Sequence, residues 1–419
     1  MRSIVRSLLA VAGGLLVAQC HEASLTAPRP ITALPRTLSA AETGLISADN
    51  RFAFSLFGEI ARETSPDSNL FISPLSAAMA LAMAYNGAAG ATRAEMQQVL
   101  QLDGMTLHDV DQSSRSLIGL LRGLDPQVVF TLANSIWYDP NPVYAPTPDY
   151  LATTRTYFDA RVESLDFRNP GAATTINAWV SDQTRGKIPT IVPDPIPPDV
   201  VAYLINAISF KGSWTARFDK SLTRPGAFRL ATGAAATVPM MTHERTVRVG
   251  YARAEGVTVL DLPYGGEAFS MTIALPQHAA GIDSLVQGLT EERWRGWVGA
   301  LDSGSFEVVM PKFTLTYGLS MNDVLAALGM PSAFCGASGT DFTRMNPTGA
   351  LCISNVKHKT SVDVNEEGTE AAAATSIEFG ITSVGPTLVV VDRPFVFAIR
   401  ERLSGTILFL GRVMNPAAT

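Results

Sequence analysis

The chain has few residues of the kind that carry enzyme chemistry. Its 419 residues include five histidines and three cysteines, and they contain no GxSxG, HExxH, GxGxxG or phosphate-binding loop motif. Among the histidines only His358 stands out. An enzyme would use it as a general base beside a serine, whereas a structural protein would bury it with a hydrogen bond across a sheet. We favour the structural role, and the sequence predicts neither an enzyme nor a bound cofactor or metal.

Charge is also scarce. Charged residues make up 17% of the chain, the net charge is −6, and no cluster of Lys and Arg is long enough to bind a polyanion. Nucleic acid is therefore excluded as an expected partner. The hydrophobic content of 47% is sufficient for a substantial core, so the chain is predicted to fold.

The N-terminal apolar run, residues 8–18, is too short to cross a bilayer. It follows two arginines and precedes Cys20, which is the layout of a signal peptide over residues 1–20. The last five of these residues, LVAQC, resemble a bacterial lipobox, in which Cys20 is lipidated and becomes the mature N-terminus. Gln19 departs from the small residue usual at that position, so ordinary cleavage is the alternative. Both readings predict an exported protein: an outer-membrane lipoprotein with no other membrane contact, or a periplasmic or extracellular protein.

The other two cysteines, Cys335 and Cys352, flank a segment rich in Gly, Ser, Thr and Asn. In an exported protein they are predicted to form a disulfide, which would contribute roughly 3 kcal/mol through loop closure. Two free, partly buried thiols are the alternative. Neither cysteine has the CxxC spacing of a metal site.

The remaining chain is predicted to be a tether followed by one domain. Residues 21–44 are rich in Ala, Thr, Pro and Ser, which is typical of a flexible tether, and residues 45–419 contain no second linker or repeat. Strands and helices do not alternate strictly, so the fold class is α+β. Segments rich in β-branched and aromatic residues predict strands over 128–138, 201–210, 257–262, 269–275, 306–317, 388–391, 395–400 and 406–413.

Helix signals are clearest after Ser73. Ser73 as N-cap, Pro74 in the first turn and Gly87 as terminator predict a buried helix. A hairpin is predicted at residues 264–267, YGGE. Two further helix starts are predicted from capping boxes, formed by Thr92 with Glu95 and by Ser320 with Asp323.

The most informative stretch is residues 366–383, EEGTEAAAATSIEFGITS. Its four consecutive alanines would favour a helix in isolation. As a strand, it would place Thr369, Ala371, Ala373 and Thr375 on one face. Such a face, built only from Thr and Ala, can enter between two existing strands and cover a core without overpacking it. A surface helix or a flexible linker is the alternative.

This stretch resembles the reactive-loop hinge of the serpins, a family of suicide protease inhibitors. The resemblance continues in order through NLFISPLS at 69–76, NAISFKGSW at 206–214, LPY at 262–264, MPKF at 310–313 and DRPFVF at 392–397. It covers almost all of residues 45–419, and it implies three β-sheets, eight or nine helices and an exposed reactive-centre loop above the largest sheet. The residues that match the hinge are Glu366, Glu367, Gly368, Thr369, Glu370, Ala371, Ala372, Ala373 and Ala374.

The resemblance also implies two structural sites beneath the loop. One is the shutter, a polar cluster where the main sheet parts, and the other is the breach, where the loop first enters. An ion pair between Lys312 and Glu366 would pin the base of the hinge, and two solvated charges are the alternative. The shutter residues are Ser73, Ser76, Asn206 and His358, and the breach residues are Trp214, Lys312 and Glu366.

A mechanism follows from the resemblance. A target protease cleaves the loop and forms its acyl-enzyme, and the cleaved loop then inserts into the main sheet of a monomeric inhibitor and traps the covalent complex. Spacing from the hinge places the cut at Thr382-Ser383, whereas spacing from Pro394 places it at Ser383-Val384. No Lys or Arg lies between Glu366 and Asp392, which favours an elastase-like or subtilisin-like serine protease over a trypsin-like one. A papain-like cysteine protease as target, and a non-inhibitory binding role on the same fold, are the alternatives.

Overall fold

The computed structural model describes residues 30–349, 351–369 and 387–418. Nine α-helices lie in these ranges: α1 Ala40–Glu63, α2 Pro74–Gly87, α3 Gly90–Val99, α4 Leu107–Gly123, α5 Pro148–Phe158, α6 Ala172–Gln183, α7 Ile282–Gln287, α8 Glu291–Gly299 and α9 Asn322–Leu328. Three short 3-10 helices accompany them: η1 Lys220–Leu222, η2 Ala279–Gly281 and η3 Pro331–Ala333.

The same ranges contain sixteen strands, and with the helices they form an α+β fold. The strands are β1 Leu70–Ile72, β2 Val128–Tyr138, β3 Ala160–Ser164, β4 Ala202–Ser213, β5 Arg224–Arg229, β6 Ala235–Thr242, β7 Val247–Ala254, β8 Val257–Tyr264, β9 Phe269–Pro276, β10 Asp302–Pro311, β11 Phe313–Ser320, β12 Lys357–Asn365, β13 Gly368–Thr369, β14 Thr387–Val390, β15 Phe395–Glu401 and β16 Ile407–Val413.

These strands form two sheets in the described part of the chain, where three are expected from the resemblance. One sheet has ten strands in the order β1-β16-β15-β9-β8-β7-β10-β6-β5, with β14 also paired to β10, and the other has six in the order β11-β12-β13-β4-β2-β3. The expected third sheet is merged with the ten-stranded one, because β10 pairs with β7 along its first half and with β6 along its last residues.

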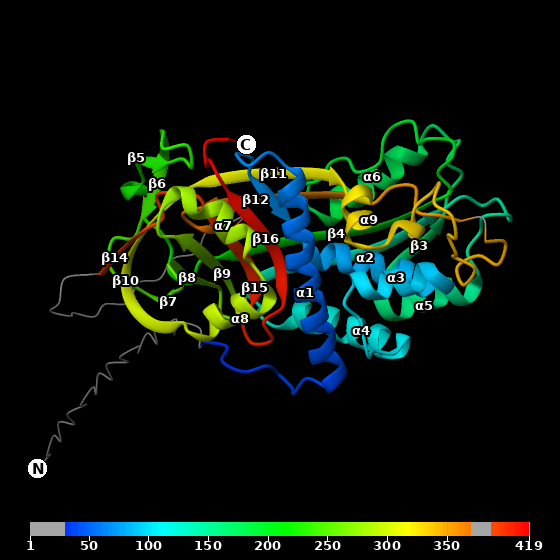
Figure 1. The fold of residues 1–419 in the computed structure, drawn as a ribbon, viewed down its shortest axis with the longest axis horizontal. Helices are drawn as coiled ribbons and strands as arrows, with labels where there is room; N and C mark the ends of the chain where they lie inside the picture. Colours follow the sequence, from blue (N-terminus) through cyan, green and yellow to red (C-terminus); the bar gives the residue numbers. More distant parts are fainter. Residues whose placement is uncertain (1–29, 350, 370–386, 419) are drawn as a thin grey trace, which may run out of the picture.

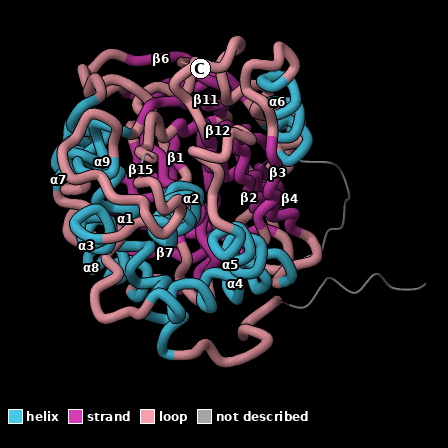
Figure 2. Tube along the Cα trace, turned by 90° about the vertical axis from the view of Figure 1, so that its right-hand side faces the viewer, coloured by secondary structure: helices cyan, strands magenta, loops and turns pink. Residues whose placement is uncertain are grey.

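The core lies between the two sheets. Phe210 of β4 contacts Tyr264 of β8 and Phe269 of β9, with ring centroids 5.1 and 5.8 Å apart, and Phe313 of β11 contacts Phe397 of β15 at 5.6 Å. Helices α2 to α5 gather at one end of the molecule (Figure 1), and in the view from that end β2 and β4 lie nearest to α4 and α5 (Figure 2). Each sheet therefore buries one face against the other, which fixes which residues of β4 and β11 point inward.

The six-stranded sheet is also covered on its second face. Helix α6 packs there through Trp179, which meets Trp137 of β2 edge-on with ring centroids 6.0 Å apart, and Ile176 and Val180 are fully buried beside it. Burial on both faces explains why residues 132–137 of β2 are all buried.

Several local predictions are confirmed. Helix α2 spans Pro74–Gly87 with the side chain of Ser73 accepting from the Ser76 backbone N–H, and residues 265–268 connect β8 to β9 as a hairpin. The predicted strand over 306–317 is two strands instead. The chain leaves the ten-stranded sheet after Pro311 and enters the six-stranded sheet at Phe313, with the Lys312 N–H bonded to the Pro239 carbonyl between them.

Both additional capping boxes are wrong. Helix α3 begins at Gly90 without a side-chain cap, and α9 begins at Asn322, also without one. Thr92 and Glu95 instead accept hydrogen bonds from the backbone N–H groups of Asp341 (3.0 Å) and Ser332 (2.9 Å). The polar side chains of Thr92 and Glu95 therefore bind backbone groups about 240 residues away in sequence, and they do not cap the first turn of α3.

The folded body begins before residue 45. Helix α1 starts at Ala40 behind a capping box between Ser39 and Glu42, and the Ile31 N–H donates to the Gly266 carbonyl at 2.8 Å. The predicted tether over 21–44 is therefore wrong for residues 40–44. The small, polar composition of this stretch resembles a linker, but Ser39 and Glu42 satisfy the free N–H groups that a helix start requires. The predicted signal peptide over 1–20, including Cys20, lies outside the described residues.

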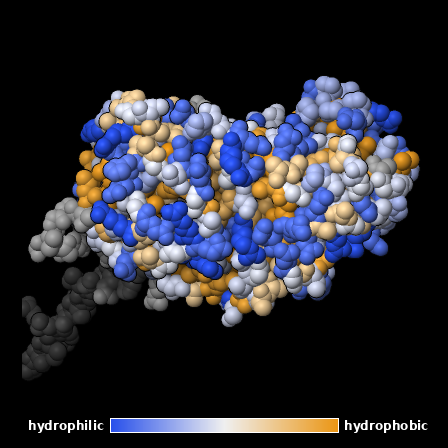
Figure 3. Space-filling view, viewed as in Figure 1, coloured by the Kyte–Doolittle hydropathy of each residue, from blue (hydrophilic) through white to orange (hydrophobic). Residues whose placement is uncertain are grey.

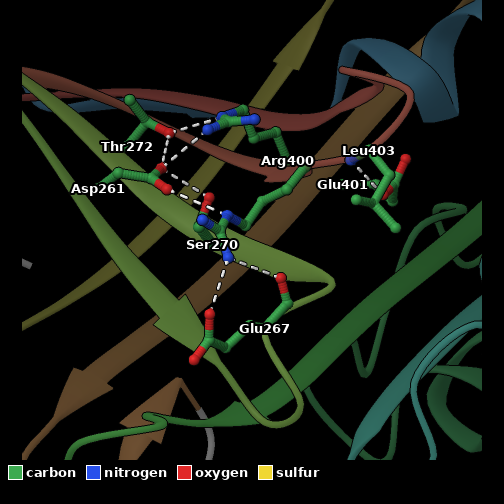
Figure 4. A network of polar contacts seen from close by, with 8 residues as sticks. Asp261, Glu267, Ser270, Thr272, Arg400, Glu401 and Leu403 are labelled. Carbon is green, nitrogen blue, oxygen red and sulfur yellow. Dashed lines mark hydrogen bonds and ion pairs between the residues drawn. The ribbon is translucent and has the colours of Figure 1, made fainter. Parts of the chain in front are cut away.

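A buried ionic cluster joins β8, β9 and β15 (Figure 4). Asp261 accepts hydrogen bonds from Ser270 (2.7 Å) and Arg400 (3.0 Å) and lies 3.3 Å from Arg402, while Arg400 also donates to Thr272 at 2.7 Å. Burial alone would raise the pKa of Asp261, but the two arginines and the hydroxyls outweigh it, so the pKa lies below its ordinary value. The carboxylate stays charged and crosslinks three neighbouring strands.

The surface that carries α1 and α7 mixes hydrophilic and apolar patches (Figure 3). Of the helices within the described ranges, none combines the length and the apolarity that a bilayer crossing requires.

Candidate functional site

The first residues of the predicted hinge lie inside the six-stranded sheet. Strand β13 holds Gly368 and Thr369 between β12 and β4, antiparallel to both. Gly368 has φ +153°, and a Cβ there would lie 2.2 Å from the Gly212 carbonyl oxygen. Only glycine, which has no Cβ, permits this approach. The position of the hinge backbone against β4 therefore requires glycine at residue 368.

Thr369 ties this short strand to the second sheet. It is 2% exposed, and its hydroxyl lies 2.6 Å from the Tyr264 hydroxyl of β8. The Tyr264 ring in turn stacks on Trp214, with centroids 4.4 Å apart. The inward orientation expected for Thr369 is therefore the one observed.

The three predicted breach residues meet around the turn between β12 and β13. Lys312 Nζ lies 3.1 Å from Glu366 Oε2, and the Trp214 indole N–H donates to the Asn365 carbonyl at 2.9 Å. The Thr223 hydroxyl donates to the other Glu366 oxygen, also at 2.9 Å. Burial alone would raise the pKa of Glu366, but its hydrogen bonds and the Lys312 charge lower it, so the carboxylate is ionised.

Sequence reasoning missed two partners of this turn. Lys220 forms an ion pair with Glu367, next to the predicted Glu366, and Tyr264 anchors Thr369. A signal for Tyr264 existed, since it belongs to the matched LPY motif. Nothing in the sequence marks Lys220, because it lies on a short 3-10 helix far along the chain from the hinge.

Beyond Thr369, no described strand lies between β4 and β12. In the described part of the chain, residues 202–211 of β4 pair only with β2, and residues 357–363 of β12 pair only with β11. A cavity of about 280 Å³ lies beside these two edges, lined by Leu204 and Ile353 among others. We call this feature the central gap. It presents two rows of backbone donors and acceptors to whatever enters it.

The predicted shutter residues surround the central gap. The Ser73 N–H donates to His358 Nε2 at 3.0 Å, and the Ser73 hydroxyl donates to the Leu408 carbonyl at 2.8 Å. The Ser76 hydroxyl makes a longer contact, 3.5 Å, with the Asn206 carbonyl. Ser76, Asn206 and His358 all line the cavity, so the structure brings the four residues together.

One contact of the shutter was not predicted. Asn206 donates to Asn134 Oδ1 at 2.6 Å, while its own Oδ1 is buried without a hydrogen-bond partner in the described ranges. His358 is buried, as the structural interpretation predicts, and desolvation lowers its pKa to about 4, so it is neutral and its Nε2 can accept from Ser73.

Cys335 and Cys352 form a disulfide with their Cα atoms 5.0 Å apart. Cys352 also lines the central gap, at the end opposite to β13. The remaining predicted site residues, Glu370, Ala371 to Ala374, Thr382, Ser383 and Val384, lie outside the described residues. Within the described ranges, no group of three or more His, Cys, Asp or Glu side chains is arranged to hold a metal ion.

Comparison with known proteins identifies the class to which this fold and site belong. The family model described as "Serpin (serine protease inhibitor)" matches residues 47–416. The leukocyte elastase inhibitor of Bos taurus is 39% identical over 383 residues, which covers 89% of this chain and 99% of that protein. The chain therefore belongs to the serpin family, which confirms the prediction of a protease inhibitor.

Solved structures agree with this assignment. The native state of tengpin, a thermophilic serpin, is 28% identical with a TM-score of 0.79, and the match covers 93% of this chain and 97% of tengpin. Human thyroxine-binding globulin complexed with its hormone is 27% identical with a TM-score of 0.80, over 90% of this chain and all of that one.

The breach generates a stability prediction. Lys312→Met keeps the apolar stem but leaves Glu366, whose side chain is 5% exposed, without its cation, and should lower the free energy of unfolding by about 1–2 kcal/mol. Lys220→Met is the matched control, because Glu367 is 21% exposed and can be solvated, and it should cost under about 1 kcal/mol. Thermal unfolding of both variants measures the difference. Equal losses would contradict the special role of the Lys312 pair.

The shutter generates a pH prediction. The pKa of His358 is about 4 in the folded state and about 6.5 when unfolded, so its stabilising contribution is complete above pH 6.5 and is lost as pH falls towards 4. The wild-type advantage over His358→Gln should therefore shrink between pH 7 and pH 4, by about 1.4 kcal/mol per unit of pKa shift. Thermal unfolding across this range measures it, with exposed His278→Gln as control. A difference that does not change with pH would exclude His358 as the titrating group.

Proposed function

We propose that this serpin inhibits an elastase-like or subtilisin-like serine protease by inserting its cleaved reactive loop into the central gap. The observation that carries the proposal is the position of β13. The first two residues of the hinge strand, Gly368 and Thr369, occupy the space between β12 and β4, and in the described ranges no strand pairs with the two edges beyond them.

The register of β13 predicts how insertion continues. Thr369 pairs with Gly212 and Val364, so antiparallel continuation sets residues 370–379 against 211–202 of β4 and residues 370–376 against 363–357 of β12. Each backbone hydrogen bond gained contributes about 1 kcal/mol net. The total is comparable with the roughly 5–15 kcal/mol that stabilises an ordinary domain.

The same register places Thr375 opposite both Asn206 and His358. Asn206 Oδ1 is the buried acceptor that has no partner in the described ranges, and a threonine hydroxyl is a suitable donor. Thr369, Ala371, Ala373 and Thr375 share one face of such a strand, and none is large enough to overpack the cavity. Insertion would thus provide hydrogen-bond partners for Asn206 in the shutter as well as for the backbone groups of the two strand edges.

The chemical step belongs to the protease. Its serine hydroxyl attacks the carbonyl of residue 382 or 383, the amine of the next residue leaves, and the resulting ester joins the two proteins. Insertion then carries the ester away from the cleavage site and distorts the catalytic geometry before water can hydrolyse the ester. The complex remains covalent.

The loop composition supports the choice of target. With no Lys or Arg between Glu366 and Asp392, the carboxylate of a trypsin-like specificity pocket would find no counter-charge. The small, uncharged residues around 382–384 suit an elastase-like or subtilisin-like pocket, and one similar protein is named as a leukocyte elastase inhibitor. A papain-like protease and a non-inhibitory binding role, as in thyroxine-binding globulin, are the alternatives that the test must separate.

Incubation with pancreatic elastase, subtilisin and papain tests the proposal. We expect an SDS-resistant complex with a serine protease, and a cleaved inhibitor that melts well above the intact one. Mass spectrometry of the released C-terminal peptide identifies the cut bond. Clean turnover without a complex or a thermal shift would favour the binding role, and a complex with papain alone would change the target class.

Thr369→Arg is the sharpest variant in this test. Arginine cannot be buried beside Tyr264, so the hinge should fail to enter and the protein should become a substrate that is cleaved but not trapped. Thr316→Arg, at an exposed position of β11 in the same sheet, is the control and should still form the complex. Retained inhibition by Thr369→Arg would mean that insertion through β13 is not the mechanism.

We also propose that the chain is an exported bacterial serpin, monomeric and held at a membrane only through lipid on Cys20. The basic and apolar residues before Cys20 and the LVAQC sequence support this proposal. Mass spectrometry of protein expressed in a bacterial host should find a mature N-terminus at Cys20 carrying lipid, and Cys20→Ser should abolish the modification. A mature N-terminus after residue 20 that carries no lipid would support export and contradict lipidation. An intact Met1 would contradict both export and lipidation.

A further inference from the structure

A second cavity lies away from the loop and the central gap. It has a volume of about 650 Å³ and runs between α1 and α7, beside the C-terminal end of β16, on the side of the molecule that faces the viewer in Figure 1. Its floor is formed by Phe54, Val286, Leu289 and Arg412, all of them buried. We call it the α1–α7 groove. Its size is in the range of pockets that hold small organic ligands.

Arg412 gives this apolar floor a positive charge. The side chain is 2% exposed, and its Nε and Nη2 donate to the backbone carbonyls of Ser65 and Ser68 at 3.0–3.2 Å. In the described part of the chain, the hydrogen bonds of the guanidinium come from Nε and Nη2, and Asp283 and Asp67, the carboxylates that act on its charge, form no ion pair with it. Burial lowers the pKa of Arg412, and the nearby Asp283, Tyr317 and Asp67 raise it by less, so the charge is compensated only in part.

A glycine keeps the groove open. Gly58 lies inside the C-terminal half of α1, where glycine costs roughly 1 kcal/mol relative to alanine, and a Cβ at this position would meet nothing within 4 Å. Gly58 lines the groove. A larger side chain would therefore project into the groove without clashing with the protein.

The charges of the rim narrow the class of ligand. Arg62 is paired with Glu59, so it contributes little net charge, and Asp283 stands exposed on the α7 side. A second negative charge on the ligand would be repelled by Asp283, whereas a single carboxylate can reach Arg412 on the floor. Between Phe54 and Arg62 the groove follows α1 for eight residues, or about 12 Å, which suits an extended apolar chain.

We propose that the α1–α7 groove binds a monocarboxylic acid with an apolar body, its carboxylate on Arg412 Nη1 and its chain along Phe54, Val286 and Leu289. Nothing in the inhibitory mechanism uses these residues. The ligand site is therefore independent of the reactive loop, and it can be tested on protein that has never met a protease.

Decanoate, below the concentration at which it aggregates, is the probe, and isothermal titration calorimetry is the measurement. We expect saturable binding of one molecule, with decylamine, which has the same chain and the opposite charge, binding at least about tenfold more weakly. Gly58→Leu should fill the groove and weaken decanoate binding by about tenfold or more, while raising helix propensity. Gly119→Leu makes the same change in α4, also into open space, and should bind decanoate like the wild type.

Three results would each overturn the proposal. They are the absence of saturable binding, equal binding of decanoate and decylamine, and unchanged decanoate binding by Gly58→Leu. Circular dichroism and formation of the protease complex verify that Gly58→Leu is folded, so a loss of decanoate binding reports on the groove. Arg412→Gln, if it folds, provides a second test of the site. It should bind decanoate and decylamine with similar affinity, because it lacks the charge that favours the carboxylate over the amine.

Discussion

Two strand edges in the centre of the six-stranded sheet, which have no strand partner beyond Thr369 in the described ranges, are the constraint on which the rest of this molecule depends. A buried or half-buried strand edge is costly unless its backbone groups find partners. Here β4 and β12 each pair fully on their outer side, and in the described ranges only Gly368 and Thr369 join them to each other. Within the described ranges, a cavity lies beside the two edges, and no strand joins them beyond Thr369.

The polar contacts at the two ends of this gap explain how the arrangement persists. At one end, Lys312, Thr223 and Trp214 fix the turn before β13, so the hinge enters in a defined register. Further along the edges, the shutter joins α2 to β12 and to the core strand β16 through Ser73, with His358 held neutral by burial. Hydrogen bonds of this kind can be exchanged for others as strands separate, which an interdigitated apolar contact cannot do without leaving a void.

Local signals were reliable where the partners of a residue lie within one turn. Ser73 caps α2 as predicted, and the YGGE segment forms a hairpin, because both depend on bonds that span two to four residues. Thr92 with Glu95 has the same local pattern as a capping box, but both side chains bond to residues 332–341 instead. For residues 40–44 the tether prediction is wrong for a related reason, since Ser39 and Glu42 begin a helix within a stretch of linker-like composition.

The sequence by itself determined the family, the inserting face of small residues and the residue types of breach and shutter. The family, breach and shutter are recognisable from contiguous motifs, and the inserting face follows from the alternation of side chains along a strand. Tertiary structure decided which of these residues meet and what lies between them. Trp214 and Asn365 are 151 positions apart, and the depth of the gap depends on whether β4 and β12 pair over their whole length. The same holds for the α1–α7 groove, whose floor combines residues from α1, α7 and β16. Such features arise from the relative placement of elements, which the packing of the whole core sets and no local pattern of residues encodes.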